Sequence, residues 1–247
     1  MIDCHCHMEY MDEPVVEEAQ LRMSAVITSV AHPKDVEKTL NLAKKYPGFV
    51  YVALGLHPTE VSKFTDEQIE DYTNLIRNNK NKIVAIGEVG LDRHWIANDE
   101  EHERSKRVFK KFIELANELK LPLVVHSRDA MGETLQMLAA ASVPVMMHCF
   151  SSRGHIEECK KMDYFMSMNT IICKSKSYSK IARDCPLELM LLETDAPWMD
   201  PSPDAKGLTN KPWNIEKAAE KIASLKNITK QEVLEATTRN AKKLFGI

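Results

Sequence analysis

Histidine and acidic residues recur at the carboxyl ends of short apolar runs along this 247-residue chain. In chain order they are His5, His7, His57, Glu88, Asp92, His126, His148, Glu193 and Asp195. Imidazole nitrogens and carboxylate oxygens are the ligands with which proteins bind Zn²⁺, Mn²⁺, Fe²⁺ or Ni²⁺, and a set without thiolates also leaves Mg²⁺ possible. The pattern therefore indicates a metal centre assembled from several strands.

The first two histidines are separated by one residue, which is the spacing of a shared strand face. His5 and His7 therefore point the same way in a strand, and both imidazoles can reach one ion. Cys4 and Cys6 alternate with them and point to the opposite face. This alternation argues against a mixed Cys/His zinc site.

Six of these side chains are the expected metal ligands, namely His5, His7, Glu88, His126, His148 and Asp195. Four histidines and two carboxylates exceed the ligands that one tetrahedral ion needs. We therefore expect two divalent ions, Mg, Mn or Zn, which in hydrolytic sites share a bridging ligand. Glu88 is the expected bridge because Gly87 before it permits close backbone approach.

Strands must position these groups, and eight apolar runs are candidates. They span residues 2–7, 25–30, 50–56, 83–89, 123–126, 145–148, 165–172 and 189–193. Unbroken apolar runs are typical of strands buried on both faces, and amphipathic segments such as 100–119 lie between them. The alternation predicts an α/β fold, a (β/α)₈ TIM barrel forming a single domain over 1–247, with the site at the carboxyl ends of its strands. An open doubly wound sheet of eight strands remains an alternative.

The remaining features of the chain limit the classes of protein to which it can belong. A helix is expected over residues 230–245, and a long loop over 197–212. The net charge of −3 provides no global field that attracts polyanions, so a nucleic-acid partner would need a local patch or bound metal. No apolar run approaches the roughly 18 residues of a membrane span. Six cysteines without a C-x-x-C pair, and no room for a cleavable leader before the first strand, make the cytoplasm the expected location.

Six short motifs occur in order along the chain. They are D-x-H-x-H at 3–7, G-L-H-P at 55–58, G-E-V-G-L-D at 87–92, V-H-S-R-D-A at 125–130, H-C-F-S at 148–151 and E-T-D-A-P at 193–197. Together with the ending N-A-K-K-L-F at 240–245, they resemble the TatD family of metal-dependent deoxyribonucleases, a branch of the amidohydrolase superfamily. The resemblance extends over essentially the whole chain.

The resemblance implies two ligand sets, one of His5, His7, Glu88 and Asp195 and one of Glu88, His126 and His148. It also implies that Asp195 and Glu88 are catalytic, with Asp195 as general base on a metal-bound water. This chemistry is physically sound because two cations lower the pKa of water toward about 7, and a carboxylate can then accept its proton.

Two residues at strand ends are expected to contact substrate. His57 and Arg128 stand where a phosphate would lie, and an arginine can bind a phosphate through two parallel hydrogen bonds. A structural role for His57 remains an alternative. Arg128 could instead pair with Asp129 or Glu133.

Other polar and aromatic residues have less specific expectations. Asp92 and Glu193 are expected to orient neighbouring groups rather than bind metal. Trp95 and Trp198 follow strand-end motifs and either stack on a base or cover the barrel mouth. His102, within the predicted helix 100–119, is expected to be solvated.

Two segments depart from the family pattern. Arg93, His94 and Trp95 follow G-L-D, where the family often has an aromatic residue directly. The 197–212 loop has only part of the family's basic, glycine-containing stretch. These segments are expected to touch substrate rather than metal, so they leave the substrate less certain than the hydrolase chemistry.

Three functions are compatible with these features. The leading hypothesis is a DNA phosphodiesterase that trims single strands from the 3′ end as a 3′-5′ exonuclease. The second keeps the metal site but acts on a small cyclic amide, lactone or phosphoester. The third is a barrel retained as a binding protein, which the complete ligand set disfavours. The sequence makes no prediction of oligomeric state.

Overall fold

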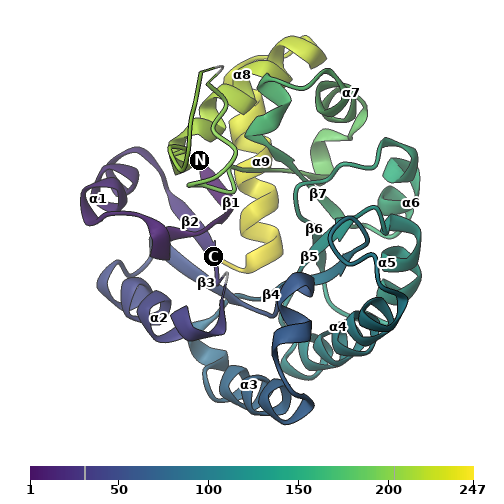
Figure 1. Cartoon of the computed structure of the whole chain (residues 1–247). Helices are drawn as coiled ribbons and strands as arrows, with labels where there is room; N and C mark the ends of the chain where they lie inside the picture. The colour runs from purple at the N-terminus through teal and green to yellow at the C-terminus, as the bar shows by residue number, and fades with distance from the viewer. Residues whose placement is uncertain (31, 203) are drawn as a thin grey trace.

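The computed structural model describes residues 1–30, 32–202 and 204–247, so position 203 of the predicted 197–212 loop lies outside it. Eight strands occur in the described residues: β1 (Ile2–Cys6), β2 (Ala25–Ser29), β3 (Val50–Leu54), β4 (Ala85–Asp92), β5 (Leu123–Arg128), β6 (Val145–Met147), β7 (Phe165–Asn169) and β8 (Met190–Glu193). They form one sheet in the order β1 to β8, and every hydrogen-bonded pair is parallel. Figure 1 shows these strands arranged as a ring.

The ring is nearly closed between its first and last strands. The backbone N–H of Asp195 donates to the carbonyl of His5 at 2.9 Å, and the N–H of His7 donates to the carbonyl of Ala196 at 2.8 Å. These bonds join the end of β1 to the chain that leaves β8. The predicted TIM barrel is therefore confirmed, and the alternative of an open sheet is wrong.

Helices follow the strands in chain order: α1 (Glu13–Arg22), α2 (Val36–Lys45), α3 (Asp66–Asn78), α4 (Asp99–Leu119), α5 (Met131–Leu138), α6 (Ile156–Lys161), α7 (Lys176–Asp184), α8 (Ile215–Lys226) and α9 (Lys230–Phe245). Figure 1 shows α1 to α8 outside the ring of strands. None of the helices in the described part of the chain has the length and apolar character that a membrane crossing requires.

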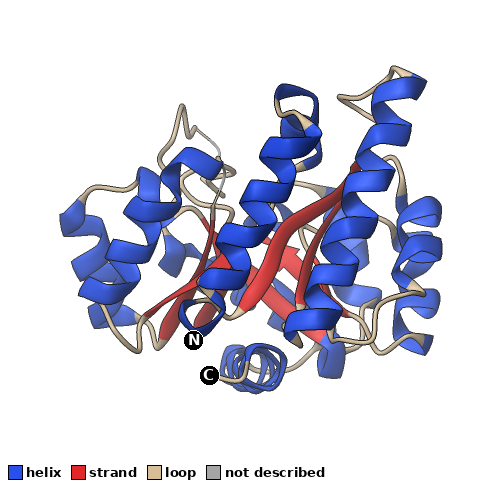
Figure 2. Ribbon diagram, turned by 90° about the horizontal axis from the view of Figure 1, so that it is seen from below, coloured by secondary structure: helices blue, strands red, loops and turns tan. Residues whose placement is uncertain are grey.

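The last helix has a different position from the others. Figure 2 shows α9 beneath the strands, close to the N-terminus. Asn240 on α9 donates its side-chain amide to the carbonyls of Leu187 and Met190, at the start of β8. The helix therefore covers the amino ends of the strands, so the cavity used by the candidate site lies at the opposite end.

Strand boundaries differ from the sequence prediction mainly around β4 and β5. Both strands extend further than expected, because their pairing continues past Gly90 and His126 to Asp92 and Arg128. The predicted strand 165–172 is shorter, since residues Thr170–Cys173 form the 3₁₀ helix η6. The extension of β4 and β5 fixes Asp92 opposite Arg128 at the rim of the barrel.

The inward face of α4 shows why one expectation fails. Val108 and Phe112 on this face are buried in the core, and His102 lies on the same face with no exposed surface. Its Nε2 is 2.7 Å from a carboxylate oxygen of Glu133 on α5. The expectation that His102 is solvated is therefore wrong, because the helical face that holds it packs inward.

Candidate metal centre

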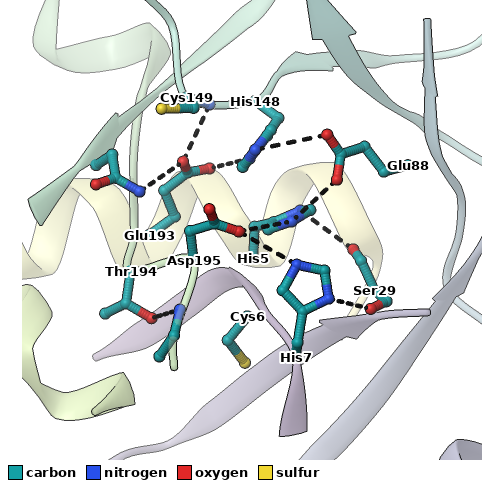
Figure 3. A network of polar contacts seen from close by, with 12 residues as sticks. His5, Cys6, His7, Ser29, Glu88, His148, Cys149, Glu193, Thr194 and Asp195 are labelled. Carbon is teal, nitrogen blue, oxygen red and sulfur yellow. Dashed lines mark hydrogen bonds and ion pairs between the residues drawn. The ribbon is translucent and has the colours of Figure 1, made fainter. Parts of the chain in front are cut away.

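The polar residues singled out from the sequence converge at the carboxyl ends of the strands. A cavity of about 540 Å³ opens there, and its lining includes His7, His57, Glu88, His126, His148 and Asp195. Figure 3 shows the network of polar contacts on the β1 and β8 side of this cavity. Side chains from β1, β4, β5, β6 and β8 are thus brought together, as the strand-end pattern predicts.

His5 on β1 and His7, the residue that follows this strand, lie on the same side of the chain. Figure 3 shows the His5 and His7 rings on the same side, and their centroids are 5.0 Å apart. Cys6 lies between them in sequence and directs its Sγ to the carbonyl of Ile27, at 3.6 Å. The alternation predicted for this segment is confirmed, and the thiol does not approach the imidazoles.

Asp195 lies just beyond β8 and turns its carboxylate toward both of these rings. Its φ of 58° is in the left-handed region, which aspartate adopts more readily than most residues. Oδ1 is 3.2 Å from Nε2 of His7 and 3.5 Å from Nε2 of His5. One carboxylate and two imidazoles therefore face a common point.

The two oxygens of Glu88 face different partners. Oε2 is 3.3 Å from Nε2 of His5. Oε1 is 2.9 Å from Nδ1 of His126 and 3.6 Å from Nε2 of His148. The carboxylate therefore lies between two groups of histidines, which is the position that a bridging ligand requires.

A close approach of β4 to β5 sets the position of this carboxylate. A Cβ atom at Gly87 would lie 2.5 Å from Cβ of Val124, closer than real contacts allow. Only glycine fits at this position without movement of the neighbouring strand. The expectation that Gly87 permits close backbone approach next to Glu88 is confirmed.

Ser29 at the end of β2 holds both His5 and His7. Nδ1 of His7 donates to the Ser29 carbonyl at 2.7 Å, and Nδ1 of His5 is 3.1 Å from Ser29 Oγ. These bonds fix the orientation of each ring. Nε2 of each ring consequently faces the carboxylates.

Carboxylates hold the other two histidines in the same manner. Nδ1 of His148 donates to Glu193 Oε2 at 2.8 Å, and Nε2 of His126 donates to Asp92 Oδ2 at 2.8 Å. In both rings the remaining nitrogen faces Glu88. Asp92 and Glu193 thus orient histidines, as the sequence indicated.

The arrangement fits divalent cations. Three groups have ligand atoms within 4.8 Å of one another: His5, His7 and Asp195; His5, Glu88 and His148; and His57, Glu88 and His126. Nε2 of His5 is buried and forms no well-aligned hydrogen bond within the described residues, although carboxylate oxygens of Glu88 and Asp195 lie 3.3 and 3.5 Å away. A buried nitrogen without a well-aligned hydrogen bond is costly, and a cation among these groups would satisfy it. The donor set of imidazoles and carboxylates is also the one that such ions prefer.

The electrostatics of the metal-free protein are those of tightly paired opposite charges. Burial lowers the pKa of His7 and His126, but hydrogen bonds to Asp195 and Asp92 outweigh it and raise both pKa values to about 9. Burial raises the pKa of Asp195, but the adjacent His5 and His7 rings reverse this and hold the pKa below its usual range. In the absence of metal, protons on the imidazoles therefore balance the buried carboxylates.

His57 lies beside this centre but differs from the other histidines. Nδ1 accepts a hydrogen bond from the backbone N–H of Thr59 at 3.3 Å, and Nε2 is 3.6 Å from Glu88 Oε1. Burial lowers the pKa of His57 to about 4, although Glu88 opposes this shift. The ring is therefore neutral at pH 7; Nδ1, which is also 2.7 Å from Thr59 Oγ1, faces Thr59, and Nε2 faces Glu88.

Arg128 is exposed at the end of β5. Its guanidinium forms neither a hydrogen bond nor an ion pair with any described residue, whereas its backbone carbonyl accepts from Arg93. Its Cζ is 5.5 Å from the centre of the Trp95 ring. The two alternative partners, Asp129 and Glu133, pair with histidines instead. The guanidinium therefore keeps its hydrogen-bond donors available at the cavity rim.

Comparison with known proteins identifies the family. A sequence model described as TatD-related DNase matches residues 2–246. The chain belongs to this family. A metal-dependent hydrolase of Methanocaldococcus jannaschii is 36% identical over 99% of this chain and 96% of its own length. The deoxyribonuclease TATDN3 of Homo sapiens is 36% identical over 99% of this chain and 94% of its own length.

Solved structures agree with this assignment to the TatD family. The crystal structure of a TatD homologue from Escherichia coli matches with a TM-score of 0.88 and 26% sequence identity, covering all of this chain and 98% of its own. A TatD-family hydrolase from Entamoeba histolytica has the same TM-score at 18% identity, which shows the shared fold. The family resemblance and the metal-dependent hydrolase expected from the sequence are confirmed.

Some residues of this TatD-family site were not singled out from the sequence. Ser29 and Thr59 hold histidine rings, and Ser167 on β7 donates to Glu193. Ser29 and Ser167 belong to strands without a histidine or acid at their ends, so they did not stand out in that pattern. A small polar residue near the carboxyl end of such a strand was the only available signal.

Proposed function

We propose that this TatD-family hydrolase cleaves phosphodiester bonds of DNA and releases nucleotides from the 3′ end of a single strand. The observation that supports it best is the position of Glu88, whose two oxygens face separate histidine groups. A site with such a carboxylate suits two cations acting on one phosphate. The human relative at 36% identity is named a deoxyribonuclease, which favours DNA over other phosphodiesters.

We assign the ligands according to the oxygen of Glu88 that each side chain faces. His5, His7 and Asp195 would hold one ion together with Oε2. His126 and His148 would hold the second together with Oε1. Mg, Mn and Zn are all compatible with this ligand set, because it contains imidazole and carboxylate but no thiolate.

Asp195 is proposed to accept the proton of the attacking water. When bound, the ions supply positive charge that acidifies water and polarises the phosphoryl oxygen. Asp195 remains ionised because His5 and His7 hold its pKa below the usual range. Its carboxylate lines the cavity, so it can reach a water molecule there.

His57 and Arg128 are proposed to bind the phosphate. With Nδ1 accepting from Thr59, neutral His57 has a proton on Nε2 and no lone pair there for a metal. This supports a hydrogen bond to a phosphate oxygen rather than metal ligation. Arg128 supplies a guanidinium with no competing ion pair, and its planar donors suit a phosphate.

The test is a nuclease assay with defined metal content. Purified protein loaded with Mg²⁺, Mn²⁺ or Zn²⁺ is incubated with a 3′-labelled single-stranded oligodeoxynucleotide, and elemental analysis confirms occupancy. We expect release of labelled mononucleotides. Loaded protein that leaves the oligonucleotide intact but hydrolyses a lactone, a cyclic amide or a small phosphoester would contradict the proposal and favour the second hypothesis.

A further inference from the structure

Trp95 occupies an unusual position for a large apolar side chain. It is 67% exposed, and yet it lines the same cavity as Glu88, His126 and Asp195. It also belongs to the Arg93–Trp95 segment that departs from the family pattern. A large exposed aromatic side chain at the mouth of a site suggests a surface that a ligand covers.

A buried carboxylate fixes this tryptophan relative to the metal centre. The backbone N–H of Trp95 donates to Asp92 Oδ1 at 2.8 Å. The other oxygen of Asp92 accepts from Nε2 of His126, also at 2.8 Å. Asp92 therefore sets the distance between Trp95 and a proposed metal ligand, which a binding surface beside a reacting phosphate requires.

The neighbours of Trp95 leave most of its ring accessible. The guanidinium of Arg128 lies over the ring, with Cζ 5.5 Å from the centroid. His94 meets the ring edge-on, with centroids 4.8 Å apart and planes at 90°. An aromatic surface and a cation without an ion pair are thus adjacent, as a nucleotide with its base and its phosphate would require.

The second tryptophan at the cavity, Trp198, is less suitable than Trp95 as a surface for a ligand. Its ring makes edge contacts to His7 at 5.0 Å and to Tyr10 at 5.4 Å between centroids. Its side chain is only partly exposed. Trp198 is therefore engaged in packing beside His7, whereas Trp95 is free to receive a ligand.

We propose that Trp95 is a nucleobase subsite, on which a base next to the scissile phosphate stacks while Arg128 contacts the phosphate. This inference rests on the proposed function, since it assumes a nucleic-acid substrate. Every base presents a flat face, so the subsite accepts all four, and purines stack more strongly because their face is larger. The subsite therefore contributes affinity and a purine preference rather than strict sequence specificity.

The experiment combines variants with a change in the substrate. Trp95→Leu and Trp95→Phe are compared with wild type on 3′-labelled oligonucleotides with either a purine or an abasic residue beside the scissile phosphate. On the purine substrate, Trp95→Leu should lose about 10-fold or more in kcat/KM, mainly through KM. On the abasic substrate its loss should be several-fold smaller, and Trp95→Phe should recover part of the activity on the purine substrate.

Trp213 provides a matched control. It lies in the 3₁₀ helix η8 (Pro212–Asn214), also with an arginine over its ring, since Cζ of Arg22 is 4.9 Å from the centroid. It is not part of the cavity lining. Trp213→Leu should therefore change kcat/KM by the same factor on the purine and the abasic substrate. Equal losses for Trp95→Leu on the purine and abasic substrates would overturn the proposal.

Failure of the proposed function would give a different result. Wild-type protein that cleaves neither oligonucleotide would contradict DNA hydrolysis. Stacking would then be tested by fluorescence anisotropy, with the same labelled oligonucleotides binding to the metal-loaded protein. A lower affinity of Trp95→Leu for the purine oligonucleotide alone would support the subsite, and equal affinities of wild type and variant would overturn it.

Discussion

Each histidine near the cavity has one nitrogen held by an outer partner and the other facing Glu88 or Asp195. For His7, His126 and His148 the held nitrogen donates, so the inner nitrogen is left for a metal. For His57 we propose that the held nitrogen accepts from Thr59, so that the inner nitrogen is a donor. Histidines that look alike in sequence are thereby divided into proposed metal ligands and one histidine that is proposed to donate a hydrogen bond to the phosphate.

Replacement of Asp195 tests the proposed base. Asp195→Asn keeps the size and the tolerance of a left-handed φ but cannot accept the proton. We expect kcat to fall by about 10²–10⁴-fold, with an unchanged circular dichroism spectrum that shows the fold is retained. Asp129→Asn is the matched control, since Asp129 also follows a strand with a φ of 54°. Undiminished turnover in Asp195→Asn would remove Asp195 from the mechanism.

Replacement of Glu193 tests the support of a proposed ligand. Glu193 is fully buried and accepts from Nδ1 of His148, the backbone N–H of Cys149, the Asn169 amide and the Ser167 hydroxyl. Glu193→Gln replaces one acceptor oxygen by a donor, so His148 loses a fixed orientation. We expect divalent-metal affinity to fall by about 10–100-fold in calorimetric titration. Unchanged affinity would show that Glu193 supports only the fold.

Among the secondary-structure elements, β4 and β5 do most to position the centre. Gly90 on β4 pairs with His126 on β5 with a φ of 145°, a conformation that L side chains rarely adopt. A Cβ atom there would lie 2.0 Å from the carbonyl oxygen of His126. The separation of Glu88 from His126 thus depends on Gly90, which follows Glu88 by two residues on β4 and pairs with His126 on β5.

The glycine requirement predicts opposite results at two positions. Gly90→Ala must displace the strand, so we expect a loss of about 2 kcal/mol or more in the free energy of unfolding. Gly132 in α5 has no atom within 4 Å of an added Cβ, so Gly132→Ala should be neutral or stabilising by roughly 0.5–1 kcal/mol. Urea unfolding measures both changes, and a stability of Gly90→Ala equal to wild type would refute the argument.

The elements also show what the sequence could predict. Apolar runs and strand-end polar residues predicted all eight strands and the convergence of His5, Glu88 and Asp195, because both depend on local pattern and barrel topology. The roles of Ser29 and Thr59 could not be predicted, since they depend on hydrogen bonds between side chains brought together by folding. The expectation that His102 is solvated was wrong for a similar reason, because its partner Glu133 lies on another helix.

At the scale of the whole molecule, buried thiols make stability depend on pH. Burial raises the pKa of Cys159 and of Cys185 to about 12. In the unfolded chain these thiols lose their protons near pH 8.5–9, whereas in the folded protein they keep them. The stabilisation is therefore complete below about pH 8.5 and is lost as pH rises toward 12.

This linkage is measurable in the alkaline range. Between pH 8 and pH 10 each of the two thiols should lower the free energy of unfolding by roughly 1 to 2 kcal/mol. The double variant Cys159→Ala/Cys185→Ala is less stable at pH 8, but its stability should fall less steeply with pH. Urea midpoints at both pH values test this, and identical slopes for the variant and wild type would contradict the assignment.

The convergence of side chains from five strands on two cations is tested most directly by anomalous diffraction from Mn²⁺- or Zn²⁺-loaded crystals. We predict two peaks about 3.5–4 Å apart on either side of the Glu88 carboxylate. One peak should lie beside His5, His7 and Asp195, and the other beside His126 and His148. Full metal loading with no peak at Glu88, or with peaks only elsewhere on the chain, would contradict the account.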